Sequence, residues 1–193
     1  MLKCYFITNK REELKMAFTR NGILLATAIT GLTSTFAQNS MQLSSTSIVD
    51  GKILQEHACR SKGGKDVSVQ LSVKDLPSEA KYLTIVMDDP DAVPVAGKTW
   101  VHWNLFNVPV SRDLNIAAGV PPEGDKGRAT GGSKGYEGMC PPNGTHTYRF
   151  AVFATKEKIE VGGFLGPTAM TIESFETKFA PSVVSKALIL GKF

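Results

Sequence analysis

Three aspartates at one corner of the chain are the first residues whose types and spacing could do chemistry. Asp88, Asp89 and Asp91 lie within four residues. Carboxylates spaced this closely repel one another unless cations or hydrogen-bond donors compensate. Pro90 fixes one backbone angle and biases Asp89 toward an extended conformation. This corner can therefore hold a carboxylate in one direction, where it could orient a histidine or accept a hydrogen bond from a ligand ammonium.

Two of the three histidines have aromatic neighbours at a spacing that suggests a site. Trp100 and His102 are two residues apart, as are His146 and Tyr148. On a strand such pairs share one face. Imidazole and phenol groups can donate hydrogen bonds to a phosphate. Taken singly, each residue is as well explained by an ordinary strand position, and only the combination points to a binding site.

The elements that must position these residues are mostly strands. Hydrophobic alternation or short apolar runs predict strands, and one segment with apolar residues on a single face predicts a helix that ends before Pro181. The predicted strands are 67–73, 82–87, 100–108, 147–154 and 183–190, and the predicted helix is 171–179. Consecutive strands without intervening helices predict an antiparallel sandwich or barrel, with the helix covering an end or a face. Residues 111–144 form a long polar segment rich in Gly and Pro, which predicts a functional loop.

The N-terminal region is typical of a secretory signal. Arg20 precedes the apolar run 22–32, and small residues at 35 and 37 suggest cleavage before Gln38. The run is too short to span a bilayer comfortably, so we expect no transmembrane span after cleavage. Since signals rarely follow a charged stretch such as 10–15, Met16 is an alternative start. We therefore expect residues 1–37 to be an extension plus signal, residues 38–193 to be the domain, and the protein to be periplasmic or secreted.

Charge and cysteines agree with this assignment. The net charge is +4, but residues 1–37 hold five basic and two acidic residues, which leaves residues 38–193 with +1. A charge this small predicts no nucleic-acid partner. Cys59 and Cys140 remain as an even pair, and in an oxidising compartment we expect them to form a disulfide. Two separate buried thiols are the alternative.

Three motifs, in order and spacing, resemble those of the phosphatidylethanolamine-binding protein family. They are Asp89-Pro90-Asp91-Ala92, Trp100-Val101-His102-Trp103, and the segment from Gly135 to Tyr148 that contains Cys140-Pro141-Pro142. The resemblance spans residues 41–193 and is nearest to bacterial, partly periplasmic members. It implies a mainly β, antiparallel Greek-key sandwich with a C-terminal helix.

The resemblance also implies a pocket for phosphate-like anions and phospholipid headgroups. Carried over by motif, its residues here are Asp89, Asp91, Trp100, His102, Tyr136, Pro141, His146 and Tyr148, with Tyr136 on the rim. Gly138 and Gly144 would let the backbone approach a ligand. Val93 and Met139 replace prolines usual in the family, which affects loop rigidity rather than the pocket.

Three functions remain open at this stage. The leading hypothesis is a non-catalytic binder of a phosphate-bearing ligand or phospholipid headgroup, without a cofactor, that could regulate a protein partner. The second is a protease or protein inhibitor acting through loops at 119–138. The third is a hydrolase using the His/Asp cluster, with or without a metal held by Asp89, Asp91, His102 and His146. The Gly-x-Ser-x-Gly match at 131–135 lacks the strand and helix that a nucleophile elbow needs.

Overall fold

The computed structural model describes residues 40–162 and 168–193. The predicted signal segment, its cleavage site and the alternative start at Met16 lie outside the described residues. No helix in the described ranges is long and apolar enough to cross a membrane.

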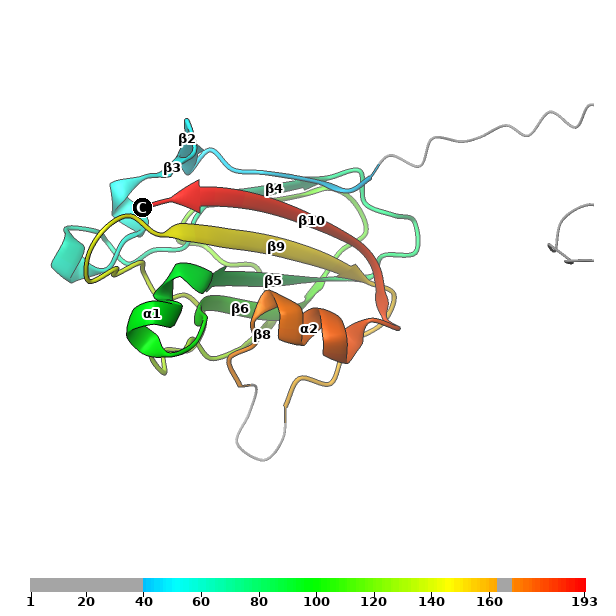
Figure 1. Cartoon of the computed structure of the whole chain (residues 1–193). Helices are drawn as coiled ribbons and strands as arrows, with labels where there is room; N and C mark the ends of the chain where they lie inside the picture. Colours follow the sequence, from blue (N-terminus) through cyan, green and yellow to red (C-terminus); the bar gives the residue numbers. More distant parts are fainter. Residues whose placement is uncertain (1–39, 163–167) are drawn as a thin grey trace, which may run out of the picture. The chain divides into compact units, whose positions relative to one another are not determined.

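Two β-sheets form the described part of the chain (Figure 1). The smaller sheet has the order β1-β4-β7, and the larger has the order β2-β3-β10-β9-β5-β6-β8. Pairing is antiparallel except for one parallel contact between β10 and β3. The strands are β1 Gln42–Ser44, β2 Ile48–Val49, β3 Lys52–Ile53, β4 Leu71–Lys74, β5 Tyr82–Asp89, β6 Trp100–Pro109, β7 Leu114–Ile116, β8 Asp125–Lys126, β9 Thr147–Thr155 and β10 Val183–Lys192. The predicted mainly β, antiparallel sandwich is confirmed.

Helical segments are short. The α-helices are α1 Val93–Ala96 and α2 Ile172–Phe179, and single 3₁₀ turns occupy Gln55–His57, Arg60–Lys62 and Pro90–Ala92. The predicted helix is α2, and Thr171 is its N-cap because its side-chain oxygen accepts a hydrogen bond from the Ser174 amide at 3.2 Å. It buries Ile172, Phe175 and Phe179, the residues that share its apolar face.

The large sheet is covered on both faces, which explains the nearly continuous apolar character of its central strands. Leu83, Ile85 and Met87 of β5 join the core shared with the smaller sheet. Val86, between them, joins a second core with Phe175 of α2. Figure 1 shows α2 lying across this outer face, over β5 and β6. The sequence of a strand that is buried on both faces is a nearly continuous apolar run and does not alternate between apolar and polar residues.

The first predicted strand begins later than the alternation suggests. Strand β4 starts at Leu71, although Val69 is fully buried. The Gln70 amide donates to the Ser47 side-chain oxygen at 2.9 Å instead of to a neighbouring strand. The long polar segment also contains two short strands, β7 and β8, which pair with β4 and β6. Strands of two or three residues carry too little periodicity to be recognised from sequence.

Candidate functional site: a cavity at the ends of three strands

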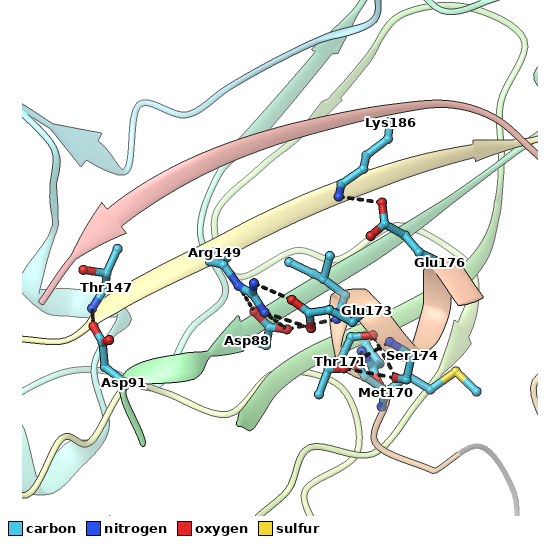
Figure 2. Close-up of polar contacts among 12 residues, drawn as sticks. Asp88, Asp91, Thr147, Arg149, Met170, Thr171, Glu173, Ser174, Glu176 and Lys186 are labelled. Atoms are coloured by element: carbon cyan, nitrogen blue, oxygen red, sulfur yellow. Dashed lines mark hydrogen bonds and ion pairs between the residues drawn. The ribbon is translucent and has the colours of Figure 1, made fainter. Parts of the chain in front are cut away.

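The three clustered aspartates point to three different partners, which resolves their repulsion. Asp88 accepts two hydrogen bonds from the Arg149 guanidinium, at 2.8 and 2.9 Å. Asp89 contacts His146 at 2.7 Å. Asp91, beyond the end of β5, accepts from the Thr147 amide at 2.7 Å. Figure 2 shows Asp88 and Asp91 with their separate partners. Because neighbouring strand residues face opposite sides, only Asp89 points to the inner layer of the sandwich.

A cavity of about 280 Å³ lies where β5 ends and where β6 and β9 begin. Six of the eight predicted site residues line it: Asp89, Trp100, His102, Pro141, His146 and Tyr148. They come from four separate parts of the sequence, which the sheet and the following loop bring together. A larger depression of about 650 Å³ lies between β3 and the end of β10, but none of the eight residues lines it. We therefore place the candidate site in the smaller cavity.

Asp89 holds His146 in one tautomer. The Asp89 carboxylate can only accept at neutral pH, so the 2.7 Å contact requires a proton on Nδ1 of His146. Both side chains are largely buried. Nε2 of His146 is then free to face a ligand, as a lone pair when the ring is neutral and as a donor when it is charged. The second oxygen of Asp89, Oδ1, is buried and has no hydrogen-bond partner among the described residues.

His102 is also fixed in one tautomer, by a backbone carbonyl. Its Nδ1 lies 2.9 Å from the Glu137 carbonyl oxygen, which can only accept. Burial lowers the pKa of His102 below its usual value, although this hydrogen bond and the nearby Asp89 oppose the shift. The His102 ring meets the Tyr148 ring edge-on, with centroids 5.2 Å apart.

Tyr148 places a hydroxyl group in this buried environment. The hydroxyl oxygen is buried and has no hydrogen-bond partner among the described residues. Burial raises the pKa of Tyr148 well above its usual value, and the charges of Asp89 and Asp91 add to the shift. The phenol therefore keeps its proton at physiological pH and can donate a hydrogen bond to a ligand oxygen.

The remaining two predicted residues do not line the cavity. Asp91 is exposed and is occupied by the Thr147 amide. The Tyr136 hydroxyl donates to the His57 carbonyl oxygen at 2.7 Å, and its ring packs edge-on against Trp103. Tyr136 thus supports the wall of the cavity instead of facing into it. Periodicity could not distinguish these directions, because both residues lie next to irregular backbone.

The loop wall of the cavity is fastened to the segment 57–66. The Cys59 amide donates to the Met139 carbonyl at 3.0 Å, and the Gly138 amide donates to Asp66 Oδ1 at 2.6 Å. Cys59 and Cys140 form the expected disulfide, with Cα atoms 5.5 Å apart. Cys140 itself lines the cavity. The wall is therefore held by one covalent bond and by hydrogen bonds with Cys59 and Asp66, which do not line the cavity.

Packing inside the protein is one reason for glycine at 138. A Cβ there would lie 2.6 Å from both Asp66 Oδ1 and the Cys59 nitrogen. This close approach is to the protein's own segment 57–66, and Gly138 also lines the cavity. Gly144 has a positive φ of 66° and does not line the cavity, so its role is in the turn.

Sequence reasoning missed Glu137 and an apolar wall. Glu137 lines the cavity, and its Oε1 accepts a hydrogen bond from the Trp100 indole nitrogen at 2.9 Å. Val95 and Ala96 of α1 form a second part of the lining. Glu137 lies inside the 135–148 motif, so its neighbours were a signal for it, whereas nothing in the sequence of α1 predicted a helical turn.

The competing motifs do not form sites in the described part of the chain. Residues 40–162 and 168–193 contain no group of three or more metal-ligand side chains arranged to hold an ion. No helix follows the Gly-x-Ser-x-Gly match at 131–135.

Comparison with known proteins identifies the family. The model of the phosphatidylethanolamine-binding protein family matches residues 44–193. A UPF0098 protein of Methanothermobacter thermautotrophicus is 38% identical over 109 residues, covering 54% of this chain and 68% of that protein. A UPF0098 protein of Chlamydia trachomatis is 36% identical over 118 residues, covering 59% of this chain and 75% of that protein.

Two solved structures have the same fold. A phosphatidylethanolamine-binding protein homologue of Chlamydia trachomatis has a TM-score of 0.66 and 29% identity, covering 80% of this chain and 97% of its own. Escherichia coli YbcL, described as a member of the mammalian family, has a TM-score of 0.66 and 24% identity, covering 80% and 98%. The family model extends over most of the chain and includes every residue of the cavity, so this protein belongs to the phosphatidylethanolamine-binding protein family.

Proposed function

We propose that this chain is a non-catalytic binding protein whose cavity holds a phosphate group, on a small molecule or on a phospholipid headgroup. The observation that carries the proposal is the pair of buried polar atoms without partners, Tyr148 OH and Asp89 Oδ1. Leaving such a group unpaired costs about 1–3 kcal/mol. A ligand that offers both an acceptor and a donor removes this cost, which supports binding in this cavity.

The chemistry of the lining favours binding over turnover. Among the described residues that line the cavity there is no Ser or Thr, and the sulfur of Cys140 is in the disulfide. A covalent mechanism through a hydroxyl of Ser or Thr or through a free thiol therefore has no candidate among these residues. The Asp89 carboxylate contacts His146, and the Glu137 carboxylate accepts from Trp100, which supports a positioning role for both. We therefore keep hydrolysis as an outcome of the test and not as the proposed activity.

We further propose that the protein acts in the periplasm or outside the cell. The disulfide supports this location, because such bonds persist mainly in oxidising compartments. Amino-terminal sequencing of the exported protein tests it. An N-terminus at Gln38 would support export with cleavage, and an intact N-terminal region on a protein recovered from the cytoplasm would contradict it.

Titration with phosphorylethanolamine, followed by NMR of the imidazole signals, tests the proposed site. We expect saturable shifts at His102 and His146 and none at His57, whose ring is fully buried and does not line the cavity. Replacing His146 with alanine should weaken binding at least tenfold. Thr145→Ala is the matched control, since this exposed neighbour does not line the cavity.

The opposite outcomes are equally informative. If no imidazole signal moves at millimolar ligand, the cavity is not the site, and binding of a protein through the loops at 119–138 becomes the better hypothesis. If a phosphoester is consumed and His102→Ala abolishes the turnover, the non-catalytic assignment is wrong.

A further inference from the structure

The disulfide between Cys59 and Cys140 is a part of the cavity wall that a dissolved thiol can reach. Cys140 is exposed and lines the cavity, whereas Cys59 is only partly exposed. In thiol–disulfide exchange, a thiolate attacks one sulfur and displaces the other, so the reaction depends on access to the sulfur that is attacked. Cys140 is therefore the sulfur more open to attack.

The Ser61 hydroxyl lies beside both sulfurs. Its oxygen is 3.1 Å from Sγ of Cys59 and 3.2 Å from Sγ of Cys140. Neither sulfur of a disulfide carries a proton, so the hydroxyl is the donor in these contacts. A hydrogen bond becomes stronger when its acceptor becomes charged, as a sulfur does when the bond to its partner breaks. Ser61 is thus placed to assist the opening of this disulfide.

The backbone holds the two cysteines to different degrees. The Cys59 carbonyl oxygen accepts hydrogen bonds from the amides of Lys62 and Gly64, at 3.0 and 3.1 Å, which fix Cys59 to the turn that contains Ser61. Among the described residues, none forms a backbone hydrogen bond with Cys140. When the disulfide opens, Cys59 therefore keeps its contact with Ser61, and Cys140 can move away with an incoming group.

Two cations flank Ser61 in the same turn. Arg60 and Lys62 are exposed, and neither forms a salt bridge with any residue that the structure describes. Nearby cations stabilise a thiolate, and a more stable thiolate leaves faster in exchange. Charge and hydroxyl together favour Cys59 as the sulfur that leaves.

We propose that this disulfide is a thiol–disulfide exchange site whose substrate is a dithiol. One thiolate of the dithiol attacks Sγ of Cys140 and forms a mixed disulfide, while Cys59 leaves as a thiolate that accepts from Ser61. The second thiolate then attacks the dithiol's own sulfur in the mixed disulfide, so Cys140 leaves and the dithiol becomes a disulfide. Two electrons pass to the protein, and the two protons of the dithiol end on the cysteines. The reaction releases the loop wall from segment 57–66 and does not depend on the proposed function.

A brief reaction of the folded protein with reduced glutathione tests the direction of attack. Glutathione has one thiol, so each molecule can form the mixed disulfide but cannot complete the reaction alone. Iodoacetamide added at low conversion then marks the cysteine that left. Peptide mapping should find glutathione on Cys140 and the alkyl group on Cys59 in about ten molecules for each one with the reverse arrangement. Equal amounts of the two arrangements, or an excess of the reverse one, would overturn the proposal.

Ser61→Ala tests the hydroxyl. The rate constant for reduction of the folded protein by dithiothreitol should fall about fivefold, because the leaving thiolate loses its donor. Ser61→Thr keeps a hydroxyl, so its rate should stay within about twofold of that of the unaltered protein. Ser78→Ala is the matched control, since this exposed serine contacts neither sulfur, and its rate should be unchanged.

The urea midpoint of the oxidised proteins separates this chemical role from a structural one. The side chain of Ser61 is exposed, so Ser61→Ala should leave the midpoint nearly unchanged while it slows reduction. Reduction of Ser61→Ala at the rate of the unaltered protein, or faster, would show that the hydroxyl takes no part. A disulfide that dithiothreitol opens only after the protein is unfolded in urea would be purely structural, and the proposal would be wrong.

Discussion

At the scale of single residues, the site depends on neighbours that face opposite sides of a strand. Asp88 and Asp89 are identical and adjacent, yet one is bound to Arg149 beneath α2 and the other to His146 in the cavity. In the same way, the side chains of Tyr148 and Arg149 point to opposite faces of β9. A step of one residue along the strand therefore separates a structural ion pair from a side chain that lines the cavity.

The buried imidazole of His102 should make stability depend on pH. Because burial lowers its pKa, the unfolded chain binds a proton more readily than the folded one. The free energy of unfolding should therefore decrease as the pH falls below about 6.5 toward the folded-state pKa. Urea unfolding at pH 7.5 and pH 5.5 measures this change.

His102→Asn is the comparison, since an asparagine amide can still donate to the Glu137 carbonyl. The variant should lose less stability between the two pH values than the unaltered protein. Carboxylates with lowered pKa, such as Glu173, lose their contribution only at lower pH, nearer 4.5 and below. An equal loss in both proteins would show that His102 does not titrate on unfolding.

At the scale of elements, an ion-pair network fastens α2 to the sheet. Arg149 bridges the buried Asp88 of β5 and Glu173 in the first turn of α2 (Figure 2). The Ile172 amide, at the start of α2, donates to Asp88 Oδ2 at 2.9 Å. Burial raises the pKa of Asp88, while the hydrogen bonds from Arg149 and Ile172 oppose the shift. Asp88 therefore needs both partners to stay charged.

Arg149→Met should destabilise the protein by about 3 kcal/mol, because it leaves the buried Asp88 carboxylate without its cation. The double variant Asp88→Asn with Arg149→Met should recover part of this loss, since the amide carries no charge and can still accept from Ile172. Urea unfolding of the two variants makes the comparison. A double variant less stable than the single one would show that the carboxylate is not the source of the cost.

At the scale of the whole molecule, one covalent bond joins distant parts of the chain. Cys59 and Cys140 are 81 residues apart, and the loop that they close contains β4 to β8. A loop of this length implies a stabilisation of roughly 4–5 kcal/mol in the chain-entropy model. Because Cys140 also lines the cavity, the same disulfide holds the loop wall in place. Its loss should therefore affect both the stability of the fold and binding in the cavity.

Replacing both cysteines with serine should lower the free energy of unfolding by about 4 kcal/mol. Ligand affinity should fall as well, because the wall that carries Pro141 loses its covalent tie. The urea midpoint of unfolding and the affinity for phosphorylethanolamine measure the two effects. The unaltered protein, measured under reducing conditions that open the disulfide, should show the same two changes. An unchanged midpoint would contradict this assignment of the disulfide.

Much of the fold was predictable because its long strands carry their own signals. Strands β5, β6, β9 and β10 and helix α2 have strong local patterns, since each buries an apolar face or both faces. Strands β7 and β8 have only three and two residues, so their pairing with β4 and β6 defines them and the local sequence does not. Six of the eight candidate site residues could be predicted to meet because they sit on strands or in motifs with fixed spacing.

The sequence by itself therefore determined the residue types of the site, the strands that carry them and the pairing of the two cysteines. Tertiary structure alone decided that Asp91 and Tyr136 turn away from the cavity, that Glu137 lines it, and that Asp89 Oδ1 and Tyr148 OH lack partners among the described residues. The physical reason is that local patterns encode which face of an element is buried. The direction of a loop side chain and the hydrogen bonds left unmade depend on contacts between residues far apart in the chain.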